Sequence, residues 1–207
     1  MPPRSHSETL ADEITLLILL KALADLGMTT RRVKLQKLTY FANVLASILG
    51  QRLTHHEFFV FKYGPFSKQL YSDIEVLVTR DLVKATPVGD IEEDEKSFEY
   101  EIKAEGISKV KKALQSPEFA EKHSVILKTL QAVGDLTTNQ IRDLSYGELN
   151  FRKAREKGIT TVIDPSYPLC LESKRLAIDV AQNEFGIHLS DEDASLMYLE
   201  LVRALAG

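Results

Sequence analysis

Hydrophobic residues along the chain recur mainly every three or four positions, which is the spacing of an amphipathic α-helix. The first such run extends from Leu10 to Leu26, and between Leu16 and Leu20 apolar residues fill nearly the whole circumference of the predicted helix. Gly27 follows as a helix stop. The pattern predicts a first helix that is deeply buried.

A second helix is predicted between Thr30, which suits the N-cap position, and Gly50, which ends the run. The apolar face of this helix comprises Leu35, Leu38, Phe41, Ala42, Leu45, Ile48 and Leu49. Leu38 is expected to be fully buried between the first two helices. The polar residues that remain, predicted to face solvent, are Arg31, Arg32, Lys34 and Lys37.

Strand signals follow the second helix. Phe58–Phe61 is a short aromatic and β-branched run, and Gly64-Pro65 is a turn signal that predicts a helix from about Pro65 to Thr79. Residues 82–88 and 98–103 then form two further strand-like runs, the second with alternating apolar and charged positions. Together these two runs predict a β-hairpin.

Helix signals dominate the second half of the chain. Helices are predicted over residues 105–114, 117–134 and 137–144, and two more close the sequence over about 171–181 and after Ser190. The stretch from Tyr146 to Pro168 contains several glycines and prolines and shows no periodicity. The predicted fold class is therefore mainly α with a small β-hairpin.

The order of the predicted elements is that of a winged-helix unit: helix, helix, short strand, helix, hairpin. We place this unit at residues 1–115 and expect residues 116–207 to be a helical extension packed on it. Hydrophobic runs continue across the boundary without a Ser/Gly/Pro-rich linker, so the two parts are expected to form one compact domain.

The composition is that of a folded soluble protein, with 44% hydrophobic and 27% charged residues among 207. The apolar run from Ile14 to Leu26 is interrupted by Lys21 and Asp25 and is shorter than the roughly 20 residues that a membrane span needs. Acidic residues precede this run where a secretory signal would be basic. A single cysteine, Cys170, excludes an intramolecular disulfide. We therefore expect a cytoplasmic protein that neither crosses nor binds a membrane.

Charge is unevenly distributed along the predicted winged-helix unit. Residues 31–84 contain nine Lys or Arg against four acids, a net charge of +5, whereas residues 85–105 have a net charge of −6. The acids of the predicted hairpin tip are Asp90, Glu92, Glu93, Asp94 and Glu95. A winged-helix protein that binds DNA needs a basic wing along the phosphates, and this tip would repel them. Protein binding is therefore favoured over DNA binding.

Catalytic and metal chemistry find little support in the sequence. His55-His56-Glu57 is the one segment that suggests a metal or acid–base site, but neighbouring side chains diverge and rarely bind one ion together. Cys170 has apolar neighbours, which favours an inert buried thiol. The chain has no glycine-rich phosphate loop, nucleophile elbow or zinc pattern. We expect no catalytic residue, metal or cofactor, although distant residues could still assemble a site.

Two motifs at the second and third helices resemble the Panacea-domain superfamily. They are VKLQKLTYFAN (33–43) and FKYGPFSKQLYSDI (61–74), in the order and at the spacing found in that family. The segment 134–158 looks like a divergent form of the family's distal helix, with Ser145-Tyr146 where a threonine-histidine pair is usual and no tryptophan. The Tyr-Gly-Pro-aromatic-Ser segment is closest to one prokaryotic branch of the family. The resemblance implies an antitoxin or proteolytic adaptor whose partner is a toxin or a protease substrate.

The candidate partner-binding residues lie on these two motifs and are Lys34, Gln36, Lys37, Tyr40, Tyr63, Gly64, Pro65 and Ser67. Lys34 and Lys37 are expected to form a cationic stripe beside Gln36, and Tyr63-Gly64-Pro65 a corner whose free backbone N–H groups could meet an acidic group. We expect the two motifs to meet on the surface. Alternatively, the lysines are only a solvated face and the corner only a turn. A winged-helix transcription regulator is the alternative function, and the oligomeric state stays open.

Overall fold

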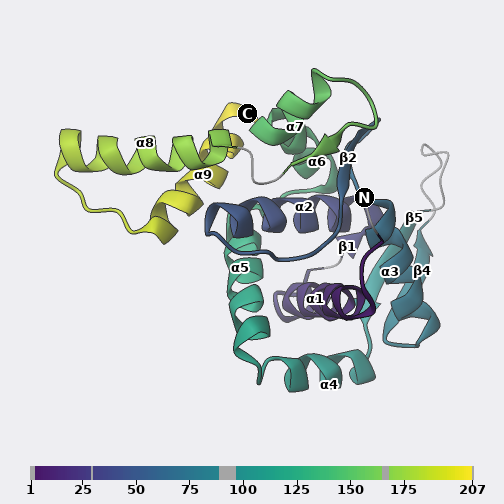
Figure 1. The fold of residues 1–207 in the computed structure, drawn as a ribbon. Helices are drawn as coiled ribbons and strands as arrows, with labels where there is room; N and C mark the ends of the chain where they lie inside the picture. Colours follow the sequence, from purple (N-terminus) through teal and green to yellow (C-terminus); the bar gives the residue numbers. More distant parts are fainter. Residues whose placement is uncertain (1–2, 29, 89–96, 165–167, 207) are drawn as a thin grey trace.

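The computed structural model describes residues 3–28, 30–88, 97–164 and 168–206, which form nine helices and six short strands (Figure 1). The helices are α1 (His6–Asp25), α2 (Arg32–Ile48), α3 (Lys68–Thr79), α4 (Ala104–Ala113), α5 (Pro117–Val133), α6 (Thr138–Gly147), α7 (Leu149–Arg155), α8 (Pro168–Phe185) and α9 (Asp191–Ala206). The predicted fold class, mainly α, is confirmed.

The strands form two small antiparallel sheets. They are β1 (Thr30–Arg31), β2 (Phe58–Phe61), β3 (Gly64–Phe66), β4 (Val83–Val88), β5 (Ser97–Ile102) and β6 (Val162–Ile163). One sheet has the order β1-β5-β4 and includes the predicted hairpin, in which Val83 pairs with Ile102. The other has the order β3-β2-β6 and pairs Val60 with Pro65. The second sheet holds the segment between α2 and α3 in place.

The core forms around α1 and α2, and α5 packs against both helices and runs across them (Figure 1). Ser5 caps α1 through a capping box with Glu8, which satisfies free N–H groups at the start of the helix. Leu16–Leu20 are all nearly inaccessible, as their all-round apolar pattern predicts. Further helices cover α2, which contacts α6, α8 and α9. The central helix α2 therefore joins the amino-terminal elements to the carboxy-terminal ones.

Leu38 tests the predicted register of the second helix, and it is fully buried. Replacing Leu38 by alanine is expected to lower the free energy of unfolding by about 2 to 5 kcal/mol, because apolar contacts are lost and a cavity remains. Urea melts of the two proteins measure this difference. Leu127→Ala, at a half-exposed position on α5, is the matched control and should cost less than about 1 kcal/mol. An equal loss in both variants would contradict the role of Leu38 in the core.

Two predicted helix starts are wrong. Thr30 belongs to β1, and the N-cap of α2 is Arg31, whose side chain makes no capping hydrogen bond. The third helix begins at Lys68 and not at Pro65, because Gly64–Phe66 pairs with β2 as a strand. Ser67 then caps α3 by accepting a hydrogen bond from the Leu70 N–H. The corner at Gly64 therefore leads into a strand, and its N–H groups are not those of a helix start.

The carboxy-terminal half contains elements that the sequence pattern does not reveal. Within the stretch that lacks periodicity lie α7, a helix of seven residues, and β6, a strand of two residues that pairs with β2. The capping box predicted for α6, Thr137 with Gln140, is present. The hairpin tip, residues 89–96, lies outside the described residues, and so does the side chain of Cys170.

The predicted division at residues 115 and 116 and the winged-helix assignment stay predictions. From α1 to β5 the predicted elements occur in the predicted order, with β1 and β3 as additional strands. Within the described ranges, every helix is too short or too polar to cross a membrane.

Candidate partner-binding site

A pocket of about 270 Å³ lies between the start of α2, the β2–β3 hairpin and α3. Its lining brings together the two sequence motifs that we predicted to meet, and consists of Val33, Gln36, Lys37, Phe61, Lys62, Tyr63, Gly64, Pro65, Phe66 and Tyr71. The rings of Phe61 and Phe66 lie 5.0 Å apart, and Phe66 packs edge-to-face against Tyr71. Four of the ten residues that line the pocket are aromatic.

Lys37 is the chemically unusual residue of this pocket. The prediction that it faces solvent is wrong, because only 3% of the residue is exposed. Its Nζ donates a hydrogen bond to the Pro65 carbonyl oxygen over 2.7 Å. Burial lowers the pKa of the Lys37 amine to about 7, and the positive charge of Arg142 adds to this effect. At neutral pH the amine is therefore close to the balance between its charged and neutral forms.

Gly64 allows the hairpin to approach Lys37. Its φ of +89° is in the region that favours glycine, and an added Cβ would lie 2.6 Å from Ser145 Oγ and 3.1 Å from Lys37 Nζ. Ser145 is buried on α6 and donates to the Arg142 carbonyl oxygen. The distal segment of the family resemblance therefore meets the Tyr-Gly-Pro motif in this fold.

The structure separates the eight predicted residues into two groups. Gln36, Lys37, Tyr63, Gly64 and Pro65 line the pocket. The other three, which do not line it, are Lys34, Tyr40 and Ser67. The motifs meet, but the prediction of an exposed patch is wrong for the buried members, which include Gln36, Lys37 and Ser67.

The three residues outside the pocket lining have structural contacts instead. Gln36 and Ser67 join the two motifs through reciprocal hydrogen bonds of 2.8 and 2.9 Å. Lys34 Nζ donates to the Gly134 carbonyl oxygen, which ties α2 to the end of α5. Tyr40 is buried and donates to the carboxylate of Glu148.

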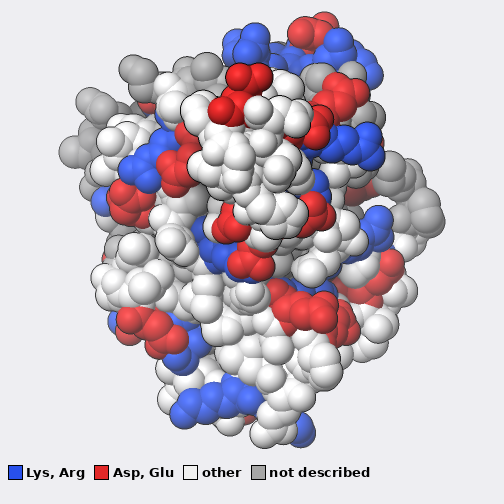
Figure 2. Space-filling model, turned by 90° about the vertical axis from the view of Figure 1, so that its left-hand side faces the viewer, with Lys and Arg blue, Asp and Glu red and all other residues white. Residues whose placement is uncertain are grey.

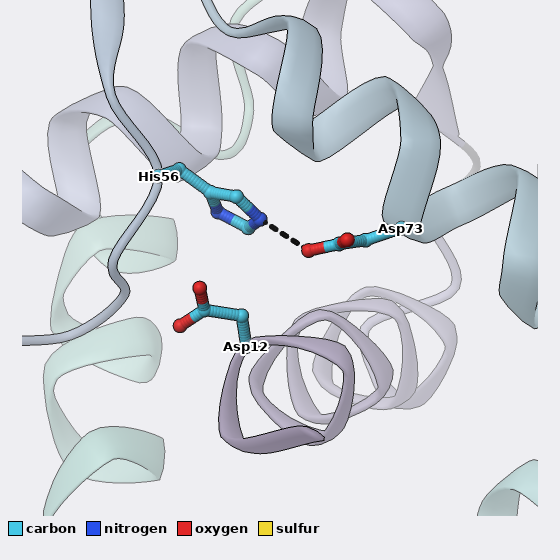
Figure 3. Close-up of side chains that lie close together, drawn as sticks. All are labelled: Asp12, His56 and Asp73. Carbon is cyan, nitrogen blue, oxygen red and sulfur yellow. Dashed lines mark hydrogen bonds and ion pairs between the residues drawn. The ribbon is translucent and has the colours of Figure 1, made fainter. Parts of the chain in front are cut away.

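A second polar cluster lies at the opposite end of the β2 segment. His56 Nε2 lies 2.7 Å from Asp73 Oδ2, and Asp12 on α1 completes the group (Figure 3). All three residues are buried. His55 also contacts Asp12, through its backbone N–H at 2.9 Å and Nδ1 at 3.1 Å. The adjacent histidines thus reach one cluster without facing one another.

These side chains offer three metal-ligating atoms within 4.8 Å of one another, but Arg4 already neutralises the carboxylates. Its guanidinium donates to Asp12 over 2.7 Å and to both oxygens of Asp73 over 2.7 and 2.9 Å. Burial raises the pKa of Asp73, but the hydrogen bonds from His56 and Arg4 outweigh it and lower the pKa overall. A cation would have to compete with Arg4, so the donor set does not fit a metal site. The cluster ties the amino-terminal segment to α3.

Sequence patterns did not identify Arg4, Asp12, Asp73 or Glu148 as members of buried networks. The one sequence feature that could have indicated a buried network is the position of Asp12 and Asp73 on helices that are otherwise rich in apolar residues. This feature does not distinguish a buried acid from an exposed one, because the side chains that bond to the buried acids come from distant segments of the chain.

Comparison with protein families shows a match to the Antitoxin SocA-like, Panacea domain over residues 35–150, which is more than half of the chain. The protein therefore belongs to this family, as its two motifs predict. The match begins within α2 and ends within α7, so it includes most of the pocket. A search of curated proteins found no match.

Proposed function

We propose that this member of the Panacea family is a non-enzymatic interaction module, an antitoxin or proteolytic adaptor, that binds a protein partner through the Lys37 pocket. The partner is a toxin or a protease substrate. The observation that supports this proposal is the convergence of both family motifs, from α2 and from the β2–β3 hairpin, on one aromatic pocket. Membership of an antitoxin-like family supports the same reading.

The size and walls of the pocket favour a protein ligand. A volume of about 270 Å³ is below the roughly 300 to 1,000 Å³ of typical small-molecule sites. At the rim, Phe61 and Tyr63 are 45% and 41% exposed. Exposed aromatic residues around a small pocket suit the anchor residue of a protein interface.

The proposal is tested with the product of the neighbouring open reading frame, because antitoxins are usually encoded beside their toxins. The two proteins are co-purified, and their affinity is measured by calorimetry. Tyr63→Ala is expected to weaken binding at least about tenfold, as expected for an interface anchor. Lys111→Ala, an exposed position on α4, is the control and should leave affinity unchanged. Failure of the proteins to bind, or equal affinity of both variants, would contradict the proposal.

The alternative, a winged-helix transcription regulator, is supported by the element order and by the net charge of +5 over residues 31–84. Figure 2 shows one face of the molecule, on which acidic and basic side chains are interspersed rather than gathered into a basic area. The net charge of the chain is −4. The negative charge of the whole chain does not favour contact with phosphates.

We predict that the native protein binds duplex DNA no better than about 10⁻⁴ to 10⁻⁶ M at physiological salt, which is the non-specific range. Replacing Asp90, Glu92, Glu93, Asp94 and Glu95 by serine removes five like charges, so that any DNA binding should rise or stay undetectable. Fluorescence anisotropy with a labelled duplex from the upstream region, at two salt concentrations, measures this. Nanomolar binding that the serine replacements weaken would support the regulator instead.

A further inference from the structure

The first turn of α2 is basic. Its first turn contains Arg32 and Lys34 and no acidic residue. The first turn of a helix already has a partial positive charge from the aligned peptide dipoles, which favours acids and disfavours cations there. This helix is 17 residues long, so the effect is fully developed. The arrangement suits an anion supplied from outside the chain.

Two cationic side chains beside the pocket have hydrogen-bond donors to spare. The Lys37 ammonium has three donors, and its described contacts use one, to the Pro65 carbonyl. The Arg32 guanidinium lies 3.5 Å from the centroid of the Tyr71 ring, and its buried Nε has no hydrogen-bond partner. Among the described residues, no carboxylate pairs with Arg32, Lys37 or Lys62.

The lowered pKa of Lys37 agrees with the absence of a paired carboxylate among the described residues. Its pKa of about 7 reflects burial together with the like charge of Arg142, without an acid that would stabilise the ammonium form. A carboxylate placed at Nζ would raise the pKa of Lys37 again, since an opposite charge within about 4 to 6 Å favours the protonated amine. The cation is therefore held in an apolar pocket that lacks its counter-ion.

We infer that the pocket binds a segment of the partner in which one aromatic or aliphatic side chain enters between the rings and an adjacent aspartate or glutamate pairs with Lys37. Arg32 stacks on the ring of Tyr71 but lies outside the pocket lining, so Lys37 is the cation assigned to this contact. This inference rests on the proposed function and names the chemistry that the partner must present. Charge-assisted hydrogen bonds to a buried ammonium make the acidic residue the selective part of the contact.

The experiment uses two small probes of similar shape, the anion 3-phenylpropionate and the neutral amide 3-phenylpropionamide. Each is titrated into the full ¹⁵N-labelled chain, and backbone amide shifts are followed at Gly64, Phe66 and Tyr71. We expect 3-phenylpropionate to shift these amides with an affinity in the millimolar range, and the amide probe to bind at least about tenfold more weakly.

Two lysine variants test whether Lys37 is responsible for the preference for the carboxylate probe. Lys37→Met should abolish the preference for the carboxylate probe, whereas Lys111→Met, at an exposed position on α4, should retain it. A thermal melt of each variant shows that it is folded. Equal binding of the two probes, no shifts in the pocket, or a preference that survives in Lys37→Met would overturn the inference.

These outcomes are separate from the test of the proposed function. If the partner binds in calorimetry and Tyr63→Ala weakens that binding, but the probes show no charge preference, the proposed interaction module is supported and the inferred acidic segment is contradicted. If 3-phenylpropionate binds selectively but the neighbouring gene product does not bind, the inferred acidic ligand is supported and the proposed partner is contradicted.

Discussion

Glu148→Ala is expected to lower the free energy of unfolding by about 4 to 6 kcal/mol, since several buried donors lose their acceptor at once. Glu148 is fully buried and caps α7 by accepting the Phe151 N–H over 2.8 Å. The Tyr198 hydroxyl and the Asn150 amide donate to Oε1 over 2.7 and 2.9 Å, and the Tyr40 hydroxyl donates to Oε2. One carboxylate therefore joins α2, α7 and α9.

Two controls make this result interpretable. Glu121→Ala removes an exposed glutamate from α5 and should change stability by no more than about 0.5 kcal/mol. Tyr198→Phe removes one of the donors named above and should cost about 2 kcal/mol, the scale of a hydrogen bond to a charged group. Urea melts followed by circular dichroism supply the three values. A loss below about 1 kcal/mol in Glu148→Ala would show that the network does not hold the carboxy-terminal helices to the core.

The helices could be predicted from the sequence because their apolar spacing is regular. The apolar face of α2 and the hairpin formed by β4 and β5 both follow from periodicities of 3.6 and 2 residues. Leu38 is buried as its register requires. Two elements lack such a pattern, α7 and β6. Helix α7 begins at its N-cap Glu148, which Tyr40 and Tyr198 on distant helices hold in place, and β6 pairs with the distant strand β2.

The candidate site could be predicted only in part. The two motifs identified the segments that meet, but periodicity assigns a lysine to the solvent face because a charged side chain is rarely buried. Lys37 is buried because the β2–β3 hairpin, through Gly64 and Pro65, covers it. The cluster of Arg4, Asp12 and Asp73 likewise depends on three segments that only the fold brings together. No local pattern contains such information.

Stability should rise with pH above neutrality, and Lys37 should cause the rise. The pKa of Lys37 is about 7 in the fold, against an ordinary value of 10.5 that applies to the unfolded chain. Between these two values the unfolded chain binds a proton that the folded chain has lost, and stability increases with pH wherever the unfolded state binds more protons. Below about pH 7 both states are protonated, and the fold bears the full cost of burying the charge.

The expected slope from Lys37 reaches at most about 1.4 kcal/mol per pH unit, and the total gain is roughly 3.5 kcal/mol between pH 7 and 10. Lys37→Met should remove this slope and raise stability at pH 7, since an apolar side chain replaces a buried charge. Lys34→Met is the control and should keep it, although desolvation also lowers the pKa of Lys34. Urea melts of the native chain and the two variants at pH 7, 8 and 9 measure how the free energy of unfolding of each changes with pH. Parallel pH profiles for the native chain and Lys37→Met would mean that the Lys37 amine keeps its proton in the fold, through water or an anion in the pocket.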